Sequence, residues 1–94
     1  MPRYLIVRSF EVGTEQMPDV GRKSRSLTED EFPQIVWEHS HVVVGEDGTV
    51  RTYCVYEAPN EEIVLEHSKK LGLHTIDALD EIAGDVTPAD FPPV

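Results

Sequence analysis

Side chains that can bind a metal, carry a proton or move an electron gather in the segment from Trp37 to Glu62. It holds His39, His41 and Cys54, which are two of the four histidines and the only cysteine, together with the only tryptophan and two of the three tyrosines. Carboxylates are close by in the chain, at Glu38, Glu57 and Glu66. Mixed nitrogen and oxygen donors favour nickel, copper or zinc over magnesium or calcium. The segment therefore indicates a site for a divalent late transition metal.

Two strand patterns joined by a turn carry these groups. Residues 35–44 and 50–57 are rich in β-branched and aromatic side chains. Between them, Gly45-Glu46-Asp47-Gly48 contains the Asp-Gly pair that is typical of a tight hairpin. We therefore expect the two segments to pair as neighbouring antiparallel strands.

The hairpin predicts which side chains share a face. Side chains alternate along a strand, so His39 and His41 lie on one face. A two-residue turn puts His41 opposite Cys54 and His39 opposite Tyr56, whereas a four-residue loop puts His39 opposite Cys54. In both registers Cys54 and Tyr56 lie on the histidine face. The other face then carries Val36, Glu38, Ser40, Val42, Tyr53, Val55 and Glu57, and the sequence does not decide which face the helices cover.

The remaining elements complete a small α+β domain. Hydrophobic spacing and capping signals predict a strand over Tyr4–Phe10, a helix from Pro18 to near Glu31, a helix after Asn60 to about Leu71, and a strand over Ala78–Val86. The order β-α-β-β-α-β predicts a ferredoxin-like sandwich, a four-stranded antiparallel sheet with two helices on one face. The nearly continuous apolar run Tyr4–Val7 predicts a first strand buried on both faces. We expect one domain over residues 1–88 and a flexible tail over 89–94.

Composition narrows the function classes. Eighteen acidic against eight basic residues give a net charge of −10, which repels nucleic acid and anionic lipid and attracts cations. A hydrophobic share of 39% is somewhat low, so we expect a second copy to complete the burial as a homodimer. One cysteine excludes an internal disulfide, and neither a signal peptide nor a membrane span is evident, so we expect a cytoplasmic protein.

Each candidate ligand also has a structural interpretation. His67 lies on the apolar stripe of the second helix, where a hydrogen-bonded core histidine is the simplest assignment. Cys54 is more simply a small buried hydrophobic residue than a thiolate, since no lysine or helix N-terminus lies beside it to lower its pKa. The tryptophan and tyrosines are most simply packing groups with polar tips.

A resemblance to a known family adds to these observations. The patterns Trp37-x-His39-Ser40-x-Val42, Tyr53-Cys54-Val55-Tyr56-Glu57-Ala58-Pro59-Asn60-Glu61-Glu62 and Glu66-His67 resemble a family of small bacterial domains typified by a nickel-binding protein. The resemblance implies a ferredoxin-like fold and a homodimer with nickel near the subunit contact. It also implies that His39 and His67 are the histidines of the shared motifs, with Cys54, Glu57 and Glu66 as further members. With His41 added from the strand pattern, the predicted metal ligands are His39, His41, His67, Cys54, Glu57 and Glu66.

Three hypotheses follow. The first is a small dimeric protein that binds nickel, or else zinc or copper, without catalysing a reaction. The second is a cofactor-free or haem-using monooxygenase of the dimeric α+β barrel type, which a deep apolar cavity between sheet and helices would favour and a filled core would oppose. The third is an interaction domain with structural histidines. A Cys54–histidine dyad is compatible with the hairpin, but neither an oxyanion hole nor a phosphate-binding loop accompanies it.

Overall fold

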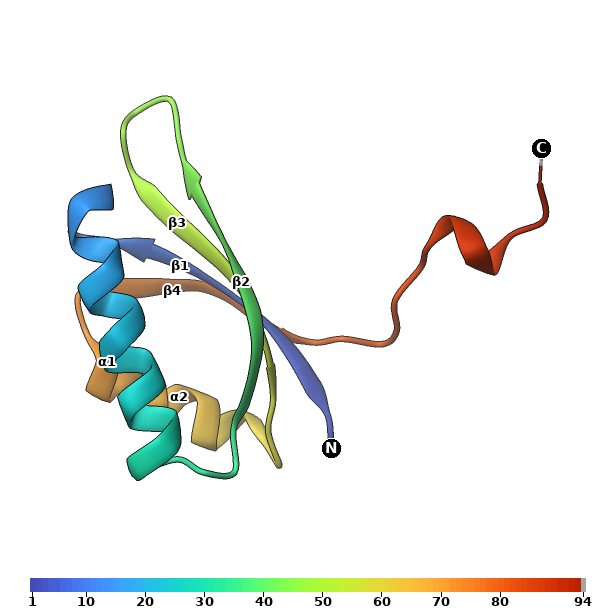
Figure 1. Ribbon diagram of the computed structural model, residues 1–94, viewed down its shortest axis with the longest axis horizontal. Coiled ribbons are helices and arrows are strands. Elements are labelled where there is room, and N and C mark those ends of the chain that lie inside the picture. The colour runs from blue at the N-terminus through green and yellow to red at the C-terminus, as the bar shows by residue number, and fades with distance from the viewer. Residues whose placement is uncertain (94) are drawn as a thin grey trace.

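Two helices cover one face of a four-stranded antiparallel sheet in the computed structural model, which describes residues 1–93 (Figure 1). The sheet has the strand order β2-β3-β1-β4. The predicted ferredoxin-like α+β fold is thereby confirmed. In chain order the elements are β1 (Arg3–Phe10), η1 (Thr14–Gln16), α1 (Met17–Asp30), β2 (Val36–Val44), β3 (Val50–Glu57), α2 (Glu61–Leu71), β4 (His74–Glu81) and η2 (Pro88–Asp90).

Local signals explain where α2 begins and ends. The Asn60 side chain accepts a hydrogen bond of 3.0 Å from the Ile63 amide, which satisfies one of the free N–H groups of the first turn. Acidic residues occupy that first turn and lysines the last, as the helix dipole favours. Gly72 follows with φ +69°, a conformation that glycine adopts without a Cβ clash. These signals agree with the predicted helix.

The helices pack on what we call the inner face of the sheet. Along β1 the side chains of Tyr4, Ile6, Arg8 and Phe10 are buried there, while those between them are half-buried on the opposite, outer face. The expected burial of this strand on both faces is therefore wrong, because both helices lie on the same side. α1 adds Val20 and Leu27 to the core, α2 adds Val64 and Leu71, and the loop after α1 adds Phe32 and Ile35.

The last strand, β4, differs from the predicted strand over Ala78–Val86. It begins at His74, directly after the Gly72 turn, and pairs with β1 from Phe10 back to Tyr4. The Ile82 amide makes a final bond of 2.7 Å to the Arg3 carbonyl. The strand ends there because β1 offers no further partner, so the apolar spacing of residues 82–86 cannot extend the sheet.

Beyond β4 the chain leaves the body of the domain and runs out as an arm (Figure 1). η2 crosses the predicted boundary between residues 88 and 89, so the division into a domain and a flexible tail stays a prediction, and Val94 lies outside the described residues. Within residues 1–93, neither helix has both the length and the apolar character needed to cross a membrane.

Candidate functional site

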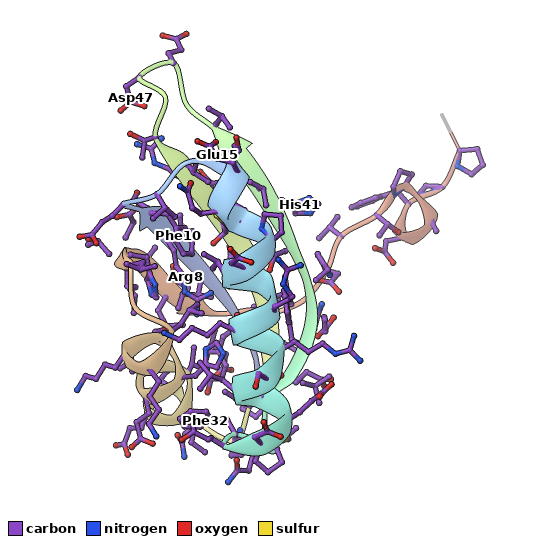
Figure 2. The ribbon with its side chains drawn as sticks, turned by 60° about the vertical axis from the view of Figure 1, so that its left-hand side comes forward. Arg8, Phe10, Glu15, Phe32, His41 and Asp47 are labelled. Atoms are coloured by element: carbon purple, nitrogen blue, oxygen red, sulfur yellow. The ribbon has the colours of Figure 1, made fainter. Side chains whose placement is uncertain are left out.

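His39 and His41 lie side by side on the outer face, which no helix covers (Figure 1). Their ring centroids are 5.4 Å apart and the rings are tilted by 77°. Both side chains are exposed, and Figure 2 shows His41 projecting from β2 away from α1. They are positioned opposite Val55 and Tyr53 of β3.

The prediction that Cys54 and Tyr56 share this face is wrong. Val44 pairs with Val50, so residues 45–49 form the hairpin loop. This loop has an odd number of residues, whereas both predicted loops had an even number. An odd loop moves the β3 side chains that pair with residues 39–44 to the opposite face relative to β2. A register shift between Trp37 and His39 puts Trp37 on the inner face with Tyr56. Cys54 and Tyr56 therefore point into the core, where they are 3% and 1% exposed.

The structure separates the six predicted ligands. His39 and His41 lie together, and Glu57 lies on the outer face at the end of β3 where it meets Val36 of β2. Cys54 is buried on the inner face, His67 is buried on α2, and Glu66 is exposed on α2. Among residues 1–93 no group of three or more His, Cys, Asp or Glu side chains is close enough together to hold a metal ion. A single copy of the chain thus supplies an imidazole pair.

Glu38, the carboxylate next to the pair, is already engaged. Arg3 donates to it through Nε at 2.7 Å and through Nη2 at 3.1 Å, and donates through Nη1 to Asp85 at 2.7 Å. The Arg3 guanidinium holds the pKa of Glu38 below its usual range. Through its contacts with Glu38 and Asp85, Arg3 connects β2, next to His39, with the start of the C-terminal arm.

The middle of the outer face, beside the histidines, carries a row of apolar side chains. Leu5 and Val7 of β1 lie beside Val55 and Tyr53 of β3, and Ala78 of β4 continues the row. Tyr53 is 36% exposed although it lies near the middle of the sheet. An apolar sheet face without a covering layer is typical of a surface that meets another protein.

Sequence reasoning missed a second group of functional side chains, on the inner face. Arg8 of β1 is 1% exposed and lies between the sheet and the helices (Figure 2). It donates to the Tyr56 hydroxyl at 3.1 Å, to Cys54 Sγ at 3.4 Å and to Ser68 Oγ at 2.9 Å. Its guanidinium also lies over the Tyr56 ring, 5.3 Å from the centroid. The available signal was the alternation of β1, which puts an arginine in the middle of an otherwise apolar face.

His67 belongs to this buried group. Its Nε2 lies 3.3 Å from Ser24 Oγ on α1, and its ring meets those of Phe32 and Tyr56 edge-on at 5.9 and 5.5 Å. Burial, and secondarily the Arg8 charge, lower the pKa of His67 from 6.5 to about 4. Burial likewise raises the pKa of Tyr56, so its hydroxyl stays protonated. The expectation of a hydrogen-bonded core histidine is confirmed.

Comparisons with known proteins agree with this geometry at the level of the fold. Residues 4–82 match the family described as nickel responsive protein, SCO4226-like. The crystal structure of SCO4226 from Streptomyces coelicolor A3(2) superposes with a TM-score of 0.68 at 20% sequence identity, covering 89% of this chain and 99% of that one. A search of curated proteins finds no match.

Proposed function

This chain belongs to the nickel responsive, SCO4226-like family, and from this premise we propose that it binds a divalent transition metal, nickel in particular, as a non-catalytic dimer. The observation that carries the proposal is the His39–His41 pair. The two imidazoles are exposed on an uncovered sheet face, and their ring centroids are 5.4 Å apart. Imidazole nitrogen suits nickel, copper and zinc. The acidic net charge of −10 favours the approach of a cation.

The residues fit part of a metal site. Two imidazoles leave further coordination positions to be filled by water or by a second copy of the chain, because Glu38 is already engaged with Arg3. Dimerisation through the outer face would bury the apolar row that includes Val7 and Tyr53 and bring a second histidine pair close by. A cytoplasmic location suits this function because Cys54, buried and free, stays reduced there.

Titration calorimetry on untagged, metal-free protein tests the metal. We expect nickel to bind the wild type, and the double variant His39→Gln/His41→Gln to lose at least about 100-fold in affinity, since even outer-sphere changes cost 10–100-fold. His67→Phe is the matched control, because its side chain faces the core on the other side of the sheet. Equal affinity in the double variant, or a loss confined to His67→Phe, would contradict the assignment of the site.

Light scattering tests the dimer separately. We expect a dimeric mass for the wild type and a monomeric mass for Val7→Glu, which puts a charge in the middle of the outer face. Glu66→Gln, an exposed change on α2, should remain dimeric. A monomeric wild type, with and without nickel, would refute the dimer.

A further inference from the structure

A cavity of about 230 Å³ lies between α1 and the inner face of the sheet. Its walls are mostly apolar and include Phe10, Met17, Val20, Trp37, Val42 and Leu71. An engineered cavity of about 150 Å³ takes up benzene, so this one can hold a benzene-sized body with a small polar group. The cavity is partly open to solvent, since Val42 on its wall is 53% exposed. It lies on the opposite side of β2 from His39 and His41, and Ser40, between the two histidines in the chain, lines it.

The polar wall of the cavity carries an arginine without a carboxylate partner. Arg8 lines the cavity, and among residues 1–93 every ion pair of the structure involves other basic side chains. The neutral groups that accept its hydrogen bonds leave Nε buried without a partner. Arginine stays protonated in proteins. A buried cation without a counter-charge carries a desolvation penalty, which an anion in the cavity would offset.

A second polar atom on the same wall lacks a partner. Thr52 lies directly opposite Arg8 in the β1–β3 register and also lines the cavity. It is 4% exposed, and its hydroxyl oxygen has no hydrogen-bond partner. Tyr56 lines the cavity as well, but its hydroxyl already accepts a hydrogen bond from Arg8. The guanidinium of Arg8 and the hydroxyl of Thr52 together form a donor set suited to the two oxygens of a carboxylate.

The helix above the cavity leaves room for a ligand. Gly21 lies inside α1 and borders the cavity, and a Cβ added there would meet no atom within 4 Å. Glycine in a helix interior makes the helix less stable than alanine would. Gly21 therefore weakens α1, but it leaves open the part of the cavity that a larger side chain would fill.

We propose that this cavity binds a small monocarboxylate with an apolar body, an aromatic or branched-chain acid, its carboxylate on Arg8 and Thr52 and its body beneath Gly21. The Arg8 guanidinium and the Thr52 hydroxyl select the carboxylate group. The apolar walls select against inorganic anions, because phosphate or sulfate would leave most of its oxygens without donors. This site lies on the opposite side of the sheet from the His39–His41 pair and does not depend on the metal proposal.

Thermal unfolding and titration with chosen probes test the inference. We expect sodium benzoate and sodium isovalerate to raise the Tm of the wild type in a saturable way. Benzamide and sodium phosphate, at the same concentration and ionic strength, should not do so. No response to either carboxylate, or an equal response to benzamide or phosphate, would overturn the proposal.

Two variants locate the site. Gly21→Leu should abolish the benzoate response while the fold is retained, since leucine is a better helix former than glycine. Arg8→Met replaces the buried charge with an apolar chain of similar length and should also abolish the response. Because it removes three buried hydrogen bonds, Gly21→Leu, which keeps them, is the variant that decides if Arg8→Met does not fold. Arg22→Met removes an exposed arginine from the same helix and should keep the wild-type response. A benzoate shift retained in Gly21→Leu and Arg8→Met, or lost in Arg22→Met, would refute the location.

Discussion

The stability of the domain should depend on pH through His67. The pKa of this side chain is about 4 in the folded protein and 6.5 as the ordinary value. Burial is the main cause, and the Arg8 charge adds to it. As the pH falls, the unfolded chain takes up the proton first, so acid favours unfolding. The contribution of neutral His67 is complete above pH 6.5 and is lost as the pH falls toward 4.

The magnitude follows from the two pKa values. Each pKa unit corresponds to about 1.36 kcal/mol, so the interval from 6.5 to about 4 represents about 3 kcal/mol at most. Linkage gives a loss of about 2 kcal/mol between pH 7 and pH 5 and about 3 kcal/mol by pH 4. Such a loss is a large share of the stability of an ordinary domain, about 5–15 kcal/mol.

Urea unfolding at several pH values between 7.5 and 4.5, followed by the fluorescence of the single tryptophan, measures this dependence on metal-free protein. The comparison is with His67→Phe, which keeps an aromatic ring against Phe32 and Tyr56 but cannot titrate. Burial also lowers the pKa of His74, and this contribution cancels because both proteins carry it. We expect the wild type to lose about 2 kcal/mol more than His67→Phe between pH 7 and pH 5.

Val64→Ala controls for a general loss of core packing. Val64 is fully buried on the same helix, so the variant should be less stable at every pH and keep the pH slope of the wild type. Equal slopes for the wild type and His67→Phe would refute the reasoning. So would a proton NMR titration of His67 with a midpoint above pH 6 in the folded protein.

Two further changes test single hydrogen bonds. Asn60→Ala removes the cap that accepts from Ile63 and should lower the free energy of unfolding by about 1 kcal/mol in urea, whereas Asn60→Asp should retain it. Tyr56→Phe removes the buried hydroxyl that accepts from Arg8 and should cost about 1–3 kcal/mol. Tyr53→Phe, on the outer face of the same strand, should change stability by less than about 0.5 kcal/mol. Equal effects of the two tyrosine changes would contradict the assignment of faces.

The order and type of the elements were predictable because their signals are local. The Asn60 cap, the lysines before Gly72 and the Asp-Gly turn each act within a few residues, and the structure has a helix end or a turn at each of them. The end of the last strand was not predictable in this way. It depends on where β1 begins, at Arg3, which lies far away in the sequence.

The candidate site shows a sharper limit, because one residue in a loop decides the face of every side chain in a strand. Strand alternation alone predicts that His39 and His41 share a face, and in the structure they do. To predict the face of Cys54, the length of the loop over 45–49 must also be known, and the Asp-Gly pair is compatible with several lengths. The Gly45 amide bonds to the Thr49 carbonyl at 2.9 Å, a closure that turn propensity alone does not select.

β3 separates the two proposed sites by the alternation of its own side chains. Its outward residues, Tyr53 and Val55, support the histidine pair, while Thr52, Cys54 and Tyr56 face the cavity and the Arg8 group. The motif Tyr-Cys-Val-Tyr, which carries the resemblance to the family, therefore contributes to both faces of the sheet. A metal bound on the outer face and a carboxylate bound in the cavity would therefore lie against different side chains of β3. Variants at Gly21 and at His41 consequently probe the two sites independently.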